Sequence, residues 1–282
     1  MRYQTAPCPA SEPPPLQRRD ILAGLSLSAT VSVSNSPAPL VLPVRARGNR
    51  CYRARENRLL AALPRHEYER LAPHLELTSM GSGRTVDAGA GANQNVYFPT
   101  DCIISVLQLI KDGRSVEVGV IGNEGVVGAS LCLGGGVAFS HAVVQARGWA
   151  YRLRSERLKQ SFNRCEATQS LVLRYTQSLY VQTAQTAVCN RHHPVLQQFI
   201  RRLLLGVDRS ATTTLAMTHQ SMAAKLGVRR ESVTEAAGKL HGMGVISCRR
   251  GRITVLDRRA LENLCCECYE VERKESARLL LM

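Results

Sequence analysis

Short runs of β-branched and other apolar residues predict β-strands in the first half of the chain. The runs lie at residues 96–99, 103–110, 116–121 and 142–146. Turn signals such as Lys111-Asp112-Gly113 separate them. Several short strands at close spacing are typical of an all-β sandwich or jelly roll, which is the architecture we predict for this region.

Helical periodicity lies on both sides of these strands. Two short helical pieces precede them, at 58–64 and 67–73, and each ends at a proline. From Ser155 to about Asn190, apolar residues recur at three- and four-residue steps, which predicts a long helical stretch. Two neighbouring edges of this stretch are apolar, and they carry Leu158, Phe162, Cys165, Leu171, Val172, Tyr175 and Leu179.

A helix of that length with two apolar edges needs more cover than one β-sandwich supplies. The economical arrangement is a symmetric partner that packs against it as in a coiled coil. The alternative is a long helix that lies on its own domain. We predict the homodimer, with the contact made by Leu171, Val172, Tyr175 and Leu179.

The most specific pattern lies late in the chain. Thr218 is a good N-cap for a helix over 219–226, Gly227 gives a tight turn, and 229–240 supplies a second helix. Two helices joined by a short glycine turn make a helix-turn-helix. The second of them carries the polar side chains that enter the major groove of DNA.

A hairpin follows over 244–256 and turns at Arg250-Gly251. The arginines near its tip are placed to meet phosphates, as in a wing. We predict DNA contacts from the two helices and the hairpin through Thr218, His219, Gln220, Arg229, Arg230, Glu231, Ser232, Thr234, Glu235, Lys239, Arg249, Arg250 and Arg252.

The distribution of charge fits a polyanionic partner. The 282 residues carry 37 Lys and Arg against 22 Asp and Glu, a formal net charge of +15. Residues 191–259 hold 13 basic and 4 acidic side chains, a net +9, and residues 1–58 hold 9 and 3, a net +6. A charge excess alone is often a solvated face, but this one coincides with the helix-turn-helix and the hairpin. We therefore predict binding to double-stranded DNA.

These motifs resemble those of the Crp/Fnr transcription regulators. Residues 215–234 and 240–246 are similar to the C-terminal domain of that family, and 96–99 and 122–128 to its β-roll sensor domain. The resemblance covers roughly residues 57–265. It implies an α+β fold with an N-terminal jelly-roll β domain, a long dimerisation helix and a C-terminal winged helix-turn-helix domain.

The resemblance implies a cytoplasmic homodimer that regulates transcription and is not an enzyme. Its partners would be double-stranded DNA and, if it activates, RNA polymerase, with no membrane partner. The predicted parts are a disordered Pro/Ser-rich basic arm at 1–56, a cyclic-nucleotide-binding-like β-roll sensor at 57–165, the dimerisation helix at 166–190, the winged helix-turn-helix at 191–265 and a tail at 266–282. Within the arm, residues 18–25 resemble a twin-arginine export signal. Another interpretation of the arm is a start codon assigned too far upstream.

Two residues match the pair with which family members read base edges. They are Arg230 and Glu231, and the chemistry agrees, because Arg binds guanine in a bidentate manner and Glu accepts from cytosine. A third family position, often Arg, is Glu235 here. The operator of the family is therefore not expected to apply at that base pair.

The sensor departs from members that bind cyclic AMP. Those members place a Glu on the ribose and an Arg on the cyclic phosphate, whereas this chain has no charged residue between Glu124 and Arg147, only His141. A buried phosphate without a cation is poorly compensated, so we expect no cyclic AMP in that mode. The oxygen-sensing branch needs an N-terminal cysteine cluster for an iron–sulfur centre, which Cys8 and Cys51 do not supply. We predict no cofactor.

Ten cysteines are scattered without the spacing of a disulfide framework, which favours a reducing compartment. Cys265 and Cys268 have C-x-x-C spacing, but no second C-x-x-C pair accompanies them, so we predict no metal. If the C-terminal helix folds back toward the end of the long helix, however, a zinc site or a thiol switch becomes an alternative. Its residues would be Cys189, His192, Cys265, Cys266 and Cys268.

A second alternative is an enzyme. Cys189 with His192 or His193 offers a nucleophile and a base. No orienting acid or oxyanion loop accompanies them in the sequence, so we predict a regulator rather than an enzyme.

Overall fold

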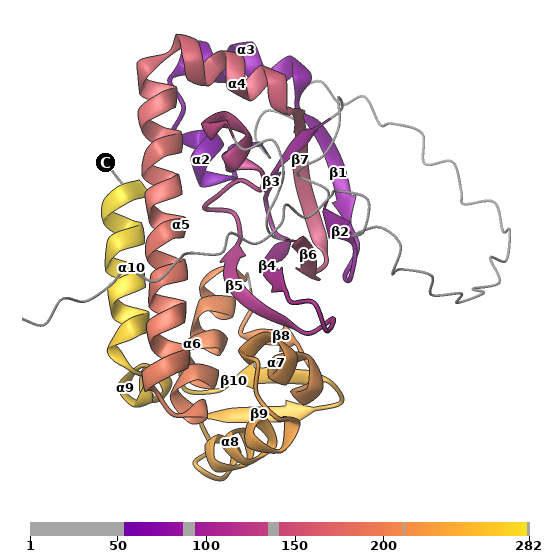
Figure 1. The fold of residues 1–282 in the computed structure, drawn as a ribbon, viewed down its shortest axis with the longest axis vertical. Helices are drawn as coiled ribbons and strands as arrows, with labels where there is room; N and C mark the ends of the chain where they lie inside the picture. The colour runs from indigo at the N-terminus through magenta and orange to yellow at the C-terminus, as the bar shows by residue number, and fades with distance from the viewer. Residues whose placement is uncertain (1–53, 87–93, 135–140, 211, 281–282) are drawn as a thin grey trace, which may run out of the picture. The chain divides into compact units, whose positions relative to one another are not determined.

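The computed structural model describes residues 54–86, 94–134, 141–210 and 212–280 (Figure 1). The segment that resembles an export signal, together with Cys8 and Cys51, lies outside the described residues. No helix among the described residues combines the length and the apolar character needed to cross a membrane.

Two antiparallel sheets form the domain that the sequence predicts to be a sensor, and we call it the sensor domain. One sheet has the order β1-β7-β3, with strands at Glu76–Met80, Gly148–Arg154 and Asn95–Pro99. The other has the order β2-β6-β4-β5, with strands at Thr85–Val86, His141–Ala146, Ile103–Leu109 and Ser115–Ile121. Inward side chains from both sheets, such as Tyr97 and Ile104, meet in one apolar core. The structure thereby confirms the predicted fold class and the strands expected from the β-branched runs.

Helices cover the other face of the β1-β7-β3 sheet. They are α2 (Arg58–Ala61), α3 (Arg65–Leu71), α4 (Ser155–Arg164) and the short turns η1 (Ala72–His74) and η2 (Ala129–Leu133). Their apolar side chains pack against Phe98, Tyr151 and Leu153 of the sheet. The two helical pieces predicted before the strands are thus confirmed.

The predicted long helical stretch consists of two helices. α4 ends at Arg164, Cys165 is extended with φ −114° and ψ 110°, and α5 runs over Glu166–His192. The break lets α4 lie on the sheet while α5 continues toward the C-terminal domain (Figure 1). The apolar pattern continues across the break because Phe162 and Leu171 belong to the same core. Periodicity alone therefore does not reveal it.

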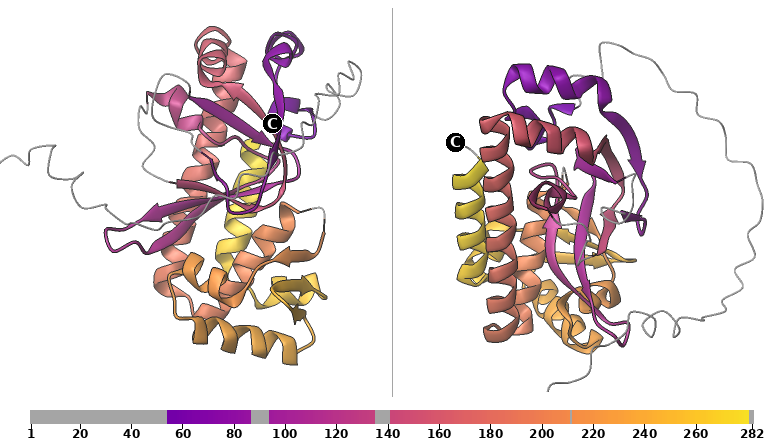
Figure 2. Two further views of the ribbon diagram at one scale, coloured as in Figure 1. Left: turned by 90° about the vertical axis from the view of Figure 1, so that its right-hand side faces the viewer. Right: turned by 45° about the horizontal axis from the view of Figure 1, so that its top comes forward.

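The C-terminal domain has its own apolar core. Around it lie α6 (Val195–Asp208), α7 (His219–Leu226), α8 (Arg230–Gly242), α9 (Arg258–Leu264) and the sheet β8-β10-β9 (Thr214–Ala216, Arg252–Val255, Ile246–Arg249). The segment predicted as a tail forms α10 (Glu267–Leu280), which packs alongside α5 (Figures 1 and 2). Among the residues that α10 covers on α5 is Gln182, which donates to Glu272 Oε1 at 2.6 Å.

Candidate DNA-binding surface and domain junction

The first helix of the pair, α7, begins with a capping box. The Thr218 side chain accepts from the Ser221 backbone N–H at 3.0 Å, and the Thr218 N–H donates to Ser221 Oγ at 3.0 Å. Gly227 ends the helix with φ 68°, a left-handed conformation that glycine adopts at little cost. The predicted cap and turn are confirmed, and three residues separate the end of α7 from the start of α8.

The second helix, α8, separates an apolar face from a polar one. Its buried side chains belong to the domain core and are Val233, Ala236, Ala237 and Leu240. Its exposed polar side chains are Arg230, Glu231, Thr234, Glu235 and Lys239. Lys239 Nζ lies 2.8 Å from Glu235 Oε1. Such a helix has one face for the core and one free for a groove of DNA.

The wing turns at the predicted position. Arg249 pairs with Arg252, which leaves Arg250 and Gly251 as the turn residues. Their φ angles are 43° and 75°, as expected for a two-residue turn in which both central residues are left-handed. The Gly251 carbonyl accepts from Met217 N at 2.8 Å, so the tip of the wing lies beside the start of α7.

All the residues predicted to contact DNA reach the surface. His219 and Ser232 are half-buried and the others are exposed. His219 Nδ1 lies 3.1 Å from Thr234 Oγ1, which joins the two helices of the motif. Their contact with DNA stays a prediction.

Several cations of the same basic segment lie elsewhere, in largely buried ion pairs. Glu117 of β5 lies 2.9 Å from Lys225 Nζ and also pairs with Arg202. Arg201 Nη2 lies 2.7 Å from Glu272 Oε2. The net charge of +9 in residues 191–259 therefore overstates the charge that this segment offers to DNA.

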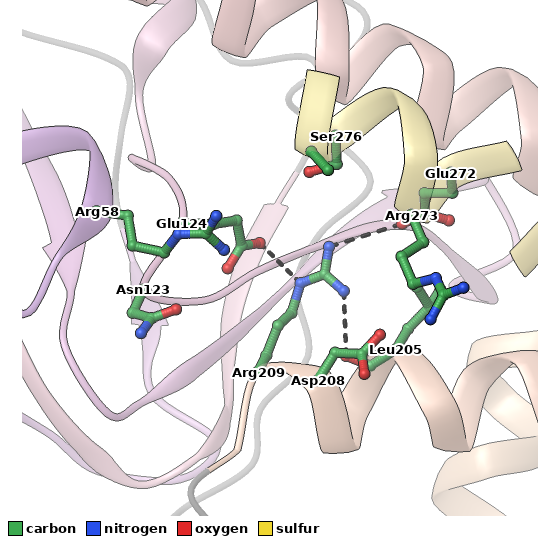
Figure 3. A pocket seen from close by; sticks show the side chains of 10 residues that line it. Arg58, Asn123, Glu124, Leu205, Asp208, Arg209, Glu272, Arg273 and Ser276 are labelled. Carbon is green, nitrogen blue, oxygen red and sulfur yellow. Dashed lines mark hydrogen bonds and ion pairs between the residues drawn. The ribbon is translucent and has the colours of Figure 1, made fainter. Parts of the chain in front are cut away.

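Arg209 occupies the junction between the sensor, α6 and α10 (Figure 3). Its Nε lies 2.7 Å from Glu124 Oε1, and its Nη2 lies 3.6 Å from Glu272 Oε1. Burial lowers the pKa of Arg209, but the two carboxylates outweigh burial and raise it overall. A pocket of about 260 Å³ opens beside this group, and Arg58 and Arg273 are also in its wall. Glu124, which precedes the stretch without charged residues at 125–146, thus pairs with the C-terminal domain.

A second cavity of about 460 Å³ lies between the sensor and α7. Ser105 and Val144 line it from the sensor, and Thr218 and Ser221 line it from α7. Lys225 Nζ donates to Ser105 Oγ at 2.9 Å at the same place. The start of α7 therefore faces the sensor as well as the wing.

The structure corrects the predicted dimer face. Leu171, Val172 and Tyr175 are 3%, 0% and 2% exposed, and Leu179 is half-buried against the same core. A side chain on Gly125 would collide with the ring of Tyr175, which shows how closely the backbone at Gly125 packs on α5. These side chains support their own sensor, so they are not available to a partner.

The exposed apolar side chains of α5 lie on another stripe. They are Leu173, Tyr180 and Val188, which are 46%, 69% and 44% exposed. Steps of seven and eight residues place them on one side of a helix. The heptad step from Leu173 to Tyr180 is present in the sequence, but the apolar pattern of Leu171 and Tyr175 is more regular and underlies the predicted dimer face.

The C-terminal cysteines fold back onto the end of α5. Cys189 Sγ lies 3.7 Å from Cys266 Sγ, and Cys268 Sγ lies 3.6 Å from His193 Nδ1. The ligand atoms of these four residues all lie within 4.8 Å of one another. The histidine in the group is His193, whereas the predicted His192 is exposed and the predicted Cys265 packs beside the group without belonging to it.

Comparison with known proteins identifies the C-terminal domain. The family model of the Crp-like helix-turn-helix domain matches residues 197–264. This stretch contains α7, α8, the wing and most of the core behind them. No curated protein sequence matches the chain.

Solved structures share the fold over a longer part of the chain. FixK2 from Bradyrhizobium japonicum is 17% identical, with 68% of this chain and 98% of that chain covered and a TM-score of 0.57. A CRP-family transcriptional regulator from Thermus thermophilus is 18% identical, with 66% and 95% covered and a TM-score of 0.55. The c-di-GMP-responsive global regulator CLP from Xanthomonas campestris is 18% identical, with 69% and 100% covered and a TM-score of 0.53.

The matched domain and the shared fold agree with the geometry. The capped helix, glycine turn, polar second helix and arginine wing all lie within or beside the matched stretch. The match to a Crp-like helix-turn-helix domain supports the predicted regulator over the enzyme alternative. The chain therefore contains a Crp-like helix-turn-helix domain and shares the fold of solved CRP-family regulators.

Proposed function

We propose that the protein acts as a homodimer that reads a palindromic DNA site, with half-sites about one helical turn apart. The observation that carries this proposal is the exposed polar face of α8 beside an arginine-tipped wing. Arg230 and Glu231 stand in the first turn of α8, the part of a recognition helix that contacts base edges. Arg250 and Arg252 would meet the flanking phosphates.

The dimer contact in this proposal is the stripe of Leu173, Tyr180 and Val188 on α5. Large apolar side chains that are 44% to 69% exposed on one helix face favour packing against a second copy. A parallel copy of α5 would bring two recognition helices to one duplex, which is the geometry a palindromic site requires.

The signal in this proposal is not cyclic AMP bound in the usual family mode. The Glu124 carboxylate is already paired with Arg209, and the Gly122 N–H donates to it at 3.2 Å. It is therefore not free to bind a ribose. The buried thiols of Cys189, Cys266 and Cys268 favour a different candidate, a response to a metal or to thiol oxidation.

Selection of bound fragments from random double-stranded DNA tests the proposal. The expected result is a palindromic consensus, bound by two chains per fragment in light scattering. Equal binding to the selected and a scrambled fragment would contradict sequence reading. Tyr180→Glu should give monomers and weaken binding, whereas Leu133→Glu, at a leucine outside α5 that is 45% exposed, should not.

A further inference from the structure

Four side chains with metal-binding atoms meet where α5 ends. Cys189 lies in the last turns of α5 and His193 is its C-cap residue. Cys266 precedes α10 and Cys268 lies in its first turn. The fold thus brings together two segments about 75 residues apart in the sequence, with Cys189 and Cys266 77 positions apart.

Two of the six distances in this cluster match the edges of a coordination tetrahedron. With zinc–sulfur bonds of about 2.3 Å and zinc–nitrogen bonds of about 2.0 to 2.1 Å, neighbouring sulfurs lie about 3.8 Å apart and sulfur and nitrogen about 3.6 Å apart. The structure has 3.7 Å between Cys189 Sγ and Cys266 Sγ, and 3.6 Å between Cys268 Sγ and His193 Nδ1. The remaining separations stay within 4.8 Å.

The surroundings support a metal ligand rather than a chance contact. His193 Nε2 lies 3.3 Å from Glu267 Oε1, and a carboxylate in that place fixes the ring with Nδ1 toward the thiols. The three cysteines are buried, so water does not compete for the position.

We propose that Cys189, His193, Cys266 and Cys268 form a closed Cys₃His site for zinc. On binding, each thiol gives its proton to solvent, and Zn²⁺ with three thiolates and a neutral imidazole carries a net charge of −1. Four protein ligands leave no open position, so the site is structural. It joins the end of α5 to the turn before α10, next to Pro194, where the chain enters the DNA-binding domain. The metal would fix the angle at which α6 leaves α5.

The first test measures the metal in the full-length protein, purified under reducing conditions and dialysed against metal-free buffer. Elemental analysis should find about one zinc per chain, the stoichiometry of a single closed site. Cobalt(II) added to the zinc-free protein should give the visible absorption of tetrahedral thiolate coordination. Absence of both signals would overturn the proposal, as would a Cys189–Cys266 disulfide in the protein as isolated.

Matched variants then assign the ligands. His193→Asn and Cys268→Ser should lose the zinc, whereas His192→Asn and Cys248→Ser, outside the cluster, should keep it. Glu267→Gln should weaken zinc affinity by about 10- to 100-fold through the orientation of His193. Glu270→Gln, an exposed acid on the same helix, should not change it. Equal zinc in His193→Asn and His192→Asn would overturn the assignment.

Circular dichroism shows whether each variant is folded. If a cysteine variant does not fold, the cobalt spectrum of the unmutated protein still tests the proposed metal site. DNA binding is measured separately on zinc-loaded and zinc-free protein. A protein that holds zinc and ignores DNA would contradict the proposed operator reading alone. A protein that binds its operator but takes up neither zinc nor cobalt would contradict the metal site alone.

Discussion

The predicted DNA-binding surface and the domain junction use arginine in opposite environments. Arg230 and Arg250 are exposed, whereas Arg201 and Arg209 are largely buried against carboxylates. An exposed guanidinium keeps its water until a phosphate or a base replaces it, so it acts in binding and in its salt dependence. A buried guanidinium has lost its water on folding and depends on its carboxylate, so it acts in the arrangement of the domains. Charge count alone does not separate these two roles.

The largest effect should come from breaking the junction. Arg209→Met leaves Glu124 and Glu272 buried near one another without the shared guanidinium. Removal of one partner from a buried pair costs about 3 to 5 kcal/mol of the free energy of unfolding. Urea unfolding should show this loss, followed by far-UV circular dichroism and by the fluorescence of Trp149, the single tryptophan, which lies in the sensor.

A second variant separates the loss of the charge pair from a loss of packing. Glu124→Leu combined with Arg209→Met removes a buried charge of each sign and should recover part of the stability, because apolar replacement of a whole pair is often tolerated. If Arg209→Met unfolds like the unmutated protein, the junction is not held by this pair.

The next effect is on the DNA-facing side. Arg230→Ala should weaken operator binding by about 1 to 3 kcal/mol and relax the preference at one base pair, because a bidentate contact to a base is lost. Its free energy of unfolding should stay unchanged, since the side chain is exposed. Fluorescence anisotropy with the operator and its single-base variants measures both changes. Arg259→Ala, an exposed arginine in α9, is the matched control.

The contrast between exposed and buried charges also explains which structural features the sequence predicts. The capping box at Thr218, the turn at Gly227 and the wing at Arg250 are local, because each depends on residues at most a few positions apart, and the structure confirms them. The pairing of Glu117 with Lys225 spans more than a hundred residues, and no local pattern marks it. The net charge counted over residues 191–259 therefore includes cations that the fold buries.

The predicted dimer face is wrong for a related reason, because a local pattern does not show which distant residues cover it. The apolar stripe through Leu171 and Tyr175 is a real helical pattern, but periodicity does not say which surface covers it. Here the sensor core does. The sequence likewise does not show that His193 rather than His192 joins the cysteine cluster. This depends on helix geometry, because His193 is the C-cap residue of α5 and its Nδ1 lies near Cys268.

The wing should show a smaller effect that depends on salt. Arg250→Asn removes a charge while keeping a residue that tolerates the left-handed backbone at φ 43°, and Arg252→Ala removes a charge from the strand beside it. Each should lower the slope of log affinity against log salt concentration by about one unit and weaken all DNA sequences alike. An unchanged slope in both variants would remove the wing from the interface.

The smallest effect on stability should come from a substitution of Glu235, an ion-paired residue on the exposed face of α8. Glu235 is exposed and forms an ion pair with Lys239. The hydrogen bond from Lys239 lowers the pKa of Glu235, so this carboxylate is ionised at neutral pH. Glu235→Gln should leave the free energy of unfolding unchanged, since exposed pairs of this kind contribute little. Its effect on DNA should be different in kind, because a carboxylate accepts from cytosine whereas an amide pairs with adenine.

Selection of bound sequences with Glu235→Gln should therefore show a changed preference at one base pair, while urea unfolding shows no change. Lys239→Met is the matched control, because it breaks the same ion pair but keeps the carboxylate, and it should retain the original preference. If both variants shift the consensus alike, the ion pair rather than the carboxylate sets the readout. If neither does, Glu235 lies outside the base-reading surface, and specificity rests on Arg230 and Glu231.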